Sequence, residues 1–414
     1  MSKAKVSKLK TAVALLVIGL FLGVVSVACS DDEETVRVGA LLPLTGSLQS
    51  YGEASRAALE LAREAINEDS DVGVELVVKD TGTDPETALA MLEELDEEGV
   101  RLVIGPYASS EVAAVNAYAD ENGIVLVSPL STAGSLAIAG DNVFRFTPDD
   151  GKEGEAVAAV ALEDGITTVV PVTREDDGNL GLQAALKRAF ESAGGTVVEG
   201  VTYAPDEDDF ETVVAALLST LGGPDSEPGE TAVYLTAFDE VVDLLGVAAT
   251  ISNDLLISAP WYGSDSVALS AGLVGDPDAA GFAVSVGYPN PILGLRDEDE
   301  GRWGPVLEAL EAELGRRPDT FALAAYDALV VGHMAIEEAG SDAGATDLGR
   351  ALVQSAASHV GLTGPAVLNE AGDRASASFD FWSVCPDGNG FTWTRTISYA
   401  VAADGSGEIT RSDC

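Results

Sequence analysis

Basic side chains are scarce in this sequence. The chain has 22 Lys and Arg residues against 69 Asp and Glu residues, and its formal net charge is −47 at pH 7. Nucleic acid is therefore not expected as a partner, because most of the surface would repel a polyanion. So strong an acidic balance is typical of a solvated surface, and we interpret it as a solubility trait unrelated to any binding site.

Long apolar runs are scarce too, and the one that stands out lies at the N-terminus. Four lysines within the first ten residues precede an apolar stretch over residues 11–25. This pattern predicts a secretory signal peptide over residues 1–28, which is removed and forms no part of the fold. Its removal would change the formal net charge from −47 to −51, since it carries four lysines and no acids. No comparable run follows, so we expect no other segment to span a membrane.

Three cysteines are present, and the first of them, Cys29, directly follows the predicted signal peptide. The segment resembles the lipobox of bacterial lipoproteins, although Ser26 stands where a branched aliphatic residue is usual. The resemblance implies that Cys29 is acylated and that residues 29–35 tether the fold to a membrane, where two or more acyl chains hold stably. An ordinary signal peptide and an uncleaved anchor are the alternatives. Lipidation would leave Cys385 and Cys414 to pair in an oxidising compartment, with two unpaired thiols as the alternative.

From residue 36 onward, short aliphatic runs alternate with longer amphipathic stretches. Several runs are apolar at nearly every position, as strands of a parallel sheet covered on both faces must be. The repeated order predicts a doubly wound α/β fold, and the number of strands favours two sheets over one. The strand candidates are residues 36–42, 74–79, 102–104, 125–127, 168–172, 197–203, 232–235, 255–258, 282–286 and 391–401. The helix candidates are residues 52–67, 85–98, 110–122, 154–163, 180–193, 210–221, 240–252, 303–314, 320–339 and 346–357.

The order and spacing of several short motifs point to a family. The motifs include VGALLPLTGSLQSYGEASRAALELAREAIN at 38–67, DTGTDPETA at 80–88, VIGPYASSEVAA at 103–114, SPLST at 128–132, FRFTPDD at 144–150, AYDALVVGHMAIEEAGS at 325–341 and GLTGPAVLNEAGDR at 361–374. With them the chain resembles the leucine/isoleucine/valine-binding protein family, the type I solute-binding proteins of bacterial ABC transporters. The resemblance runs from about residue 36 to residue 380.

The resemblance implies two parallel-sheet lobes joined by a hinge of three crossings, with a small ligand clamped between them. We expect residues 36–147 and 282–340 to form the first lobe, residues 148–281 and 341–384 the second, and residues 385–414 a C-terminal extension. We expect a monomer that is anchored by lipid, through Cys29, to the outer face of the cell membrane. It would deliver an amino acid, or a molecule like one, to a membrane permease, and no cofactor is implied.

Two serine-bearing turns follow neighbouring strand candidates. Ser109 or Ser110 stands at the start of a helix, where unpaired N–H groups and a partial positive charge suit a carboxylate. The resemblance matches Ser109 with the family's carboxylate-binding serine, and an ordinary helix cap is the alternative. It also matches Ser131 with a residue whose backbone binds ligand and Thr132 with a hydroxyl donor, although a lone ST turn would be structural. Convergence of such residues at adjacent strand ends is what a binding crevice requires.

The resemblance assigns the cationic end of a ligand to Asp265. This residue matches the acidic side chain that meets the ammonium group in amino-acid binders of the family, and an ammonium group taken out of water needs a paired charge. An Asp that satisfies its own turn is the alternative. Tyr51 and Phe238 match aromatic residues that cover apolar ligand atoms, unless they simply fill the core.

One position departs from the family pattern. Asp177 stands where a ligand-contacting tyrosine is usual, and an additional residue shifts the register of this segment. The departure leaves branched-chain specificity open and allows a more polar or more cationic ligand. The alternative is an exposed acidic loop that never reaches the ligand.

Signals of catalysis are missing from the sequence. His333 lies in an apolar helix candidate, His359 precedes GLTGP, and no metal-ligand spacing, phosphate-binding glycine loop or GxSxG motif occurs. The sequence therefore favours a binding protein over an enzyme, and neither a catalytic nor a metal site is expected. Two other classes stay open: a ligand-sensing ectodomain that reports to a separate receptor and, less favoured, a secreted hydrolase that depends on Ser109.

Overall fold

The computed structural model describes residues 34–223, 229–251, 253–376, 378–388, 390–401 and 407–414. By its internal contacts the chain divides into an N-terminal unit, Met1–Glu34, and a compact unit, Thr35–Cys414. The predicted signal peptide, Cys29 and nearly all of the predicted tether lie outside the described residues. Everything below concerns the compact unit.

The first sheet is built from the N-terminal part of the compact unit. Its spatial order is β2 (Val72–Asp80), β1 (Glu34–Leu42), β3 (Leu102–Ile104), β4 (Val125–Ser128) and β5 (Val143–Arg145). Parallel pairing joins β1 to β3, β3 to β4 and β4 to β5, and β3 and β4 are buried at every position. These strands are aliphatic runs that only a sheet covered on both faces can shield from water.

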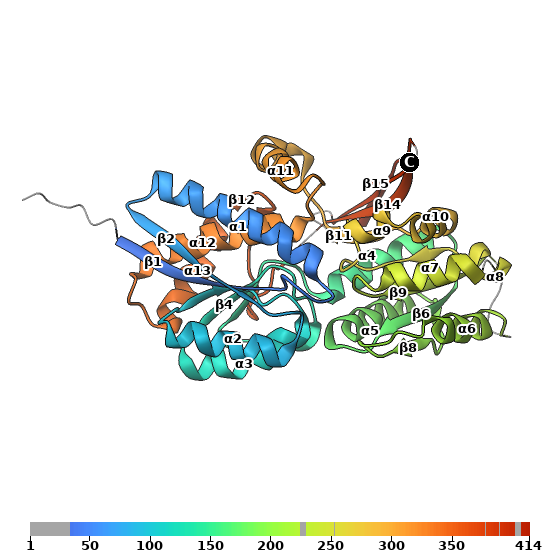
Figure 1. The fold of residues 1–414 in the computed structure, drawn as a ribbon, viewed down its shortest axis with the longest axis horizontal. Helices are drawn as coiled ribbons and strands as arrows, with labels where there is room; N and C mark the ends of the chain where they lie inside the picture. The colour runs from blue at the N-terminus through green and yellow to red at the C-terminus, as the bar shows by residue number, and fades with distance from the viewer. Residues whose placement is uncertain (1–33, 224–228, 252, 377, 389, 402–406) are drawn as a thin grey trace, which may run out of the picture. The chain divides into compact units, whose positions relative to one another are not determined.

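Helices cover both faces of this sheet (Figure 1). One face packs against α1 (Gln49–Asp69), α12 (Thr320–Ala339) and α13 (Ala345–Ser358), and the other against α2 (Pro85–Glu97) and α3 (Ser109–Asn122). Within the described residues, α12 is the helix long and apolar enough to cross a membrane, but 78% of its apolar window is buried inside the protein. Its side chains fill the first core.

A second parallel sheet follows along the chain. Its order is β10 (Trp261–Tyr262), β9 (Thr231–Thr236), β6 (Thr168–Arg174) and β7 (Thr196–Val197), and β8 (Val201–Tyr203) also pairs with β6. All of these pairs are parallel. Two apolar clusters lie on this sheet. One contains side chains of α4 (Asp150–Glu163) and α5 (Asp177–Ser192). The other contains side chains of α6 (Phe210–Leu221), α7 (Val241–Ile251) and α10 (Pro277–Val286). The predicted α/β class with parallel sheets is confirmed.

An antiparallel sheet ends the chain. Its order is β11 (Asn290–Leu293), β14 (Phe379–Asp387), β15 (Gly390–Val401) and β16 (Gly407–Arg411), and β15 contains the strand predicted at 391–401. A disulfide joins Cys385 to Cys414, which confirms the predicted pairing. The remaining elements are α8 (Asp254–Ser258), α9 (Ala271–Gly275), α11 (Glu300–Leu314), β12 (Val360–Gly361), β13 (Gly364–Pro365) and two short 3₁₀ turns, Gly134–Leu136 and Asp297–Asp299.

Two of the predicted strands are helices instead. Residues 255–258 lie in α8, and residues 282–286 are the last residues of α10. The Asp276 side chain caps α10 by accepting backbone hydrogen bonds from its first turn, and Gly287 ends the helix in the left-handed conformation. A short apolar run fits a buried strand and a buried helix equally well by periodicity, so the flanking caps decided the outcome.

Two helices pack differently from the predicted lobe boundaries. α13 lies in the range 341–384 that was predicted for the second lobe, but it packs against α12 and contributes Leu348 and Leu352 to the core of the first sheet. Residues 282–286 were predicted for the first lobe, but α10 packs against α7 in a core of the second sheet. We therefore propose that α13 belongs to the first lobe and α10 to the second.

Candidate functional site

The hydroxyl groups of Ser109 and Ser131 lie side by side. Ser109 is the first residue of α3, which follows β3, and Ser131 follows β4. The two oxygens are 3.1 Å apart, and the Ser109 hydroxyl also accepts a hydrogen bond from the backbone N–H of Ala133. Because β3 and β4 are neighbouring parallel strands, their carboxyl ends bring the two predicted serines to one point.

The helix cap beside these serines is not the one that the sequence predicted. Ala108, and neither Ser109 nor Ser110, is the cap residue of α3. The carboxylate of Glu111 accepts a hydrogen bond from the Ala108 N–H at 2.9 Å. Burial raises the pKa of Glu111 to about 7, against the opposite effects of Thr81 and of the Ala108 N–H. The Ser109 side chain therefore contacts Ser131 rather than its own helix end.

Thr132 connects this turn to the start of α4. Its carbonyl oxygen accepts a hydrogen bond of 2.8 Å from the backbone N–H of Asp150. Asp150 is 1% exposed, yet neither of its carboxylate oxygens has a hydrogen-bond partner among the described residues. Burial raises the pKa of Asp150 to about 7; the Thr132 side chain opposes this rise, and the negative charge of Asp265 adds to it. Asp150 was not among the predicted site residues.

Asp265 follows β10 and meets a second carboxylate that the sequence did not single out. Its backbone N–H donates to Glu153 Oε1 at 3.2 Å, and the Ser266 hydroxyl donates to the Asp265 carboxylate at 3.0 Å. Burial raises the pKa of Asp265 to about 6, and burial together with the charges of Asp265 and Asp150 raises the pKa of Glu153 well above its ordinary range. Buried carboxyls that repel one another in this way favour their protonated forms.

Arg145 stabilises the turn that carries Ser131. Its Nε donates to Asp373 Oδ1 at 2.5 Å, and its Nη1 donates to the Ala133 carbonyl oxygen at 2.7 Å. The side chains of Arg145 and Asp373 are each 1% exposed. A buried, hydrogen-bonded ion pair of this kind sets geometry, because either charge left alone would be strongly destabilising.

The predicted aromatic residues both have protein partners. The Tyr51 hydroxyl donates to the Ala268 carbonyl oxygen at 2.9 Å, and its ring lies 6.0 Å from that of Phe321. The guanidinium group of Arg174 lies 4.7 Å from the ring centre of Phe238. Tyr51 therefore holds the segment that follows Asp265 against α1, and the cation of Arg174 covers one face of Phe238.

Asp177 is exposed at the first position of α5. A different residue of the same turn approaches the serine pair: a Cβ added to Gly178 would lie 3.6 Å from Ser109 Oγ. The N-terminus of α5 thus lies close to the N-terminus of α3. Two helix starts at one place favour a negatively charged ligand group.

The histidines take no part in this arrangement. The Nε2 atom of His333 hydrogen-bonds to the Val72 carbonyl oxygen at 2.8 Å, as expected for a packed residue of α12. In the part of the chain that the structure describes, no three His, Cys, Asp or Glu side chains are grouped to hold a metal ion.

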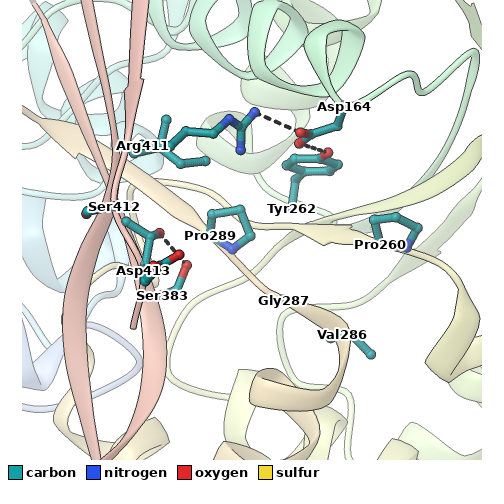
Figure 2. A pocket seen from close by; sticks show the side chains of 12 residues that line it. Asp164, Pro260, Tyr262, Val286, Gly287, Pro289, Ser383, Arg411, Ser412 and Asp413 are labelled. Atoms are coloured by element: carbon teal, nitrogen blue, oxygen red, sulfur yellow. Dashed lines mark hydrogen bonds and ion pairs between the residues drawn. The ribbon is translucent and has the colours of Figure 1, made fainter.

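A separate groove of about 530 Å³ lies where the end of the chain meets the second sheet. Figure 2 shows Arg411 and Tyr262 pointing toward Asp164 in this groove. The Tyr262 hydroxyl donates to Asp164 at 2.7 Å, and Arg411 pairs with Asp164 at 2.7 Å. None of the predicted ligand-binding residues lines the groove. Its contacts attach the C-terminal strands to the end of α4.

Comparisons with known proteins agree with this architecture. The family model described as periplasmic binding protein matches residues 35–384. The chain is 27% identical over 408 residues to the uncharacterised protein MJ1266 of Methanocaldococcus jannaschii, with 91% of this chain and 94% of that protein covered. It is 25% identical over 368 residues to Leu/Ile/Val-binding protein homolog 3 of Brucella melitensis, with 87% and 93% covered.

A solved structure shows the same fold. It is that of LivJ, the branched-chain amino acid transporter substrate binding protein of Streptococcus pneumoniae, in complex with isoleucine. The TM-score is 0.71 at 20% identity, and the match covers 92% of this chain and 100% of LivJ. The chain therefore belongs to the periplasmic binding protein family, and it shares the type I fold of LivJ. This is a family of solute-binding proteins that act outside the cytoplasm.

Proposed function

We propose that this protein captures an amino acid, or a molecule like one, between its two parallel-sheet lobes for import by an ABC transporter. The names of its relatives support an amino-acid ligand, since one is a Leu/Ile/Val-binding homolog and LivJ holds isoleucine. The geometry supports it independently.

The observation that carries the proposal is the opposite character of two neighbouring groups of residues. Ser109 and Ser131 offer hydroxyl groups beside two helix N-termini, which suits a carboxylate. The Thr132–Asp150 hydrogen bond joins this first group to the second. In the second group, Asp265 offers a buried carboxylate, which suits an ammonium group. A dipolar amino acid matches both groups at once.

The mechanism follows from the contacts that join the two sides. The Asp150 N–H bonds to the Thr132 carbonyl oxygen, the Tyr51 hydroxyl bonds to the Ala268 carbonyl oxygen, and the Ser50 hydroxyl lies 3.2 Å from Asp239. These contacts hold the lobes together, and a ligand that touches both sides adds to them. Only such a ligand shifts the population toward the closed form, which is the form that a permease would recognise.

The cellular setting in this proposal comes from the N-terminal sequence. Residues 1–28 direct export, Cys29 carries the lipid, and residues 29–35 tether a monomeric binding protein to the outer face of the membrane. The disulfide between Cys385 and Cys414 is consistent with an oxidising compartment.

Calorimetric titration of the purified protein with a panel of amino acids tests the proposal. We expect at least one to bind, and we expect Asp265→Asn to weaken that binding about tenfold or more, because it removes the charge that faces the ammonium group. Asp243→Asn is the matched control, since Asp243 is an exposed acid on α7. A panel without any binder, or an Asp265→Asn variant with unchanged affinity, would contradict the assignment.

A further inference from the structure

The cluster beside Asp265 contains more carboxyl groups than one ammonium group can pair with. Asp150, Glu153 and Asp265 are 1%, 2% and 3% exposed. The first two lie in the first turn of α4, and the charges of Asp150 and Asp265 both act on Glu153. An amino acid with an uncharged side chain brings a single positive group to these three carboxyls. The other carboxyls would then have to stay protonated or carry an unpaired charge, which is costly in a protein interior.

A second observation points to a bound group at the same place. The Tyr234 hydroxyl and both carboxylate oxygens of Asp150 are buried and have no hydrogen-bond partner within the described residues. Tyr234 is 1% exposed, and it lies close enough to Glu153, Asp265 and Asp150 for all three charges to act on it. Folded proteins rarely leave buried polar atoms unpaired, so a ligand with several N–H donors fits this cluster.

One basic residue of this region acts on Asp150, and it is shared with another carboxylate. Arg145 favours the ionised form of Asp150, but its Nε pairs with Asp373 and its Nη1 bonds to the Ala133 carbonyl oxygen. Its Nη2 is buried and has no hydrogen-bond partner within the described residues. A single arginine shared with Asp373 does not balance three further carboxyls, so the remaining positive charge has to come with the ligand or as protons.

We propose that the solute is a basic amino acid, whose α-ammonium group and cationic side chain are both bound by Asp150, Glu153 and Asp265. The inference rests on the proposed function of this site and names the class of its ligand. The α-carboxylate is bound by Ser109 and Ser131, so a diamine without a carboxylate matches only half of the site. A branched-chain amino acid leaves part of the carboxylate cluster unmatched.

Isothermal titration of the protein, dialysed free of bound solute, with L-lysine, L-ornithine, L-arginine, L-leucine and putrescine tests this assignment. We expect at least one basic amino acid to bind about tenfold or more tightly than both L-leucine and putrescine. Glu153→Gln should weaken the binding of that amino acid about tenfold or more, while the affinity for L-leucine stays or rises. The substitution is nearly isosteric and replaces a carboxyl group that is already hard to ionise, so the fold should tolerate it.

Glu155→Gln is the matched control, because it removes the same charge from an exposed position of α4. We expect it to change each affinity less than about twofold. If Glu153→Gln loses its native circular dichroism spectrum, Asp150→Asn provides the same test, because Asp150 is the other acidic residue in the first turn of α4.

The outcomes separate this inference from the proposed function. If L-leucine binds more tightly than every basic amino acid, the inference is wrong and the proposed function stands. If putrescine binds as tightly as the best basic amino acid, the solute is a cation but not an amino acid, and the inference is again wrong. If no amino acid binds at all, the proposed function itself is overturned.

Discussion

Glu111 combines a structural role with a pKa far from its ordinary value. The residue is buried, its carboxylate accepts the Ala108 N–H, and burial raises its pKa to about 7. An unfolded glutamate has a pKa of about 4.3, so the folded protein binds this proton more tightly than the unfolded chain does. The stability that this group contributes is complete below about pH 4 and is lost as the pH rises through about 7.

Glu111→Gln should remove this pH dependence. The glutamine oxygen can still accept the Ala108 N–H but cannot ionise, so we expect the variant to gain stability relative to the wild type by about 1 kcal/mol per pH unit between pH 5 and pH 7. Urea unfolding across this range measures the difference between the two proteins. Glu86→Gln, at an exposed position of the first turn of α2, is the control and should show a constant difference. A constant difference for Glu111→Gln as well would show that burial does not affect this carboxyl as described.

Burial also raises the pKa values of three carboxyls in the candidate site, those of Asp150, Glu153 and Asp265, where a bound ligand would lower them again. Burial raises the pKa of each of these carboxyls, so the folded protein without ligand favours their protonated forms. A cation bound among them would favour the ionised forms instead. The carboxyls whose ionised forms are unfavourable in the ligand-free protein are therefore the same groups that would bind a positive charge.

At the scale of elements, the close packing of α4 on α5 depends on a glycine. A Cβ added to Gly154 would lie 2.6 Å from the carbonyl carbon of Ala185, which is backbone and cannot rotate away. α4 carries Asp150 and Glu153, and the N-terminus of α5 approaches Ser109. The distance between the two helices thus determines where both halves of the candidate site lie.

Gly154→Ala should therefore destabilise the protein by about 1–3 kcal/mol, because the methyl group forces the two helices apart. The matched control is Gly246→Ala in the middle of α7, where an added Cβ meets nothing within 4 Å among the atoms considered. That variant should be stabilised by up to about 1 kcal/mol through the better helix propensity of alanine. Denaturant unfolding of both variants makes the comparison, and equal effects of the two substitutions would refute the packing argument.

At the scale of the whole molecule, the antiparallel C-terminal sheet joins separate regions of the chain. β11 pairs with β14, and Phe381 of β14 lies in a core of the second sheet. The Cys385–Cys414 disulfide links β14 to the end of the chain, and Arg411 of β16 pairs with Asp164 after α4. The C-terminal extension is thus fastened to the second sheet at several points.

Replacing both cysteines by serine should lower the free energy of unfolding by about 3 kcal/mol, since the disulfide closes a loop over a sequence separation of 29 residues. The affinity for the solute should not change, because no residue of the candidate site lies in that loop. Thermal unfolding with and without a reductant provides the check. The wild type should lose thermal stability on reduction, whereas the stability of the double variant should not change. A wild type whose stability is unchanged by the reductant would count against the prediction.

Much of the architecture could be predicted from local sequence. Runs such as 102–104 and 125–127 are apolar throughout, and buried parallel strands follow from that pattern. The runs at 255–258 and 282–286 are also mostly apolar but are helices, because Asn253 and Asp276 cap them. Apolar content alone does not separate the two cases, and the caps were the signal that could have done so.

Part of the candidate site could be predicted because its residues follow predicted strands. Ser109 and Ser131 lie a few residues after β3 and β4, so the topology brings them toward one edge of the first sheet. Asp265 lies shortly after β10, which was not predicted, and its assignment came from the family resemblance. Asp150 and Glu153 lie at a helix start, where acidic residues are common and usually exposed. Their sequence signals were the FRFTPDD motif at 144–150, which ends at Asp150, and the position of Glu153 directly before the helix candidate at 154–163. Many solvated acids lie in such places.

The sequence by itself determined the alternation of strands and helices and the family, because both depend on local pattern. It favoured pairing of the two C-terminal cysteines, which the structure then showed. The tertiary structure alone decided which acids are buried. Asp150 and Glu153 lose contact with water only because α4 packs against α5 and against the turn that carries Thr132, and this burial turns two ordinary acidic residues into part of a cation-binding cluster.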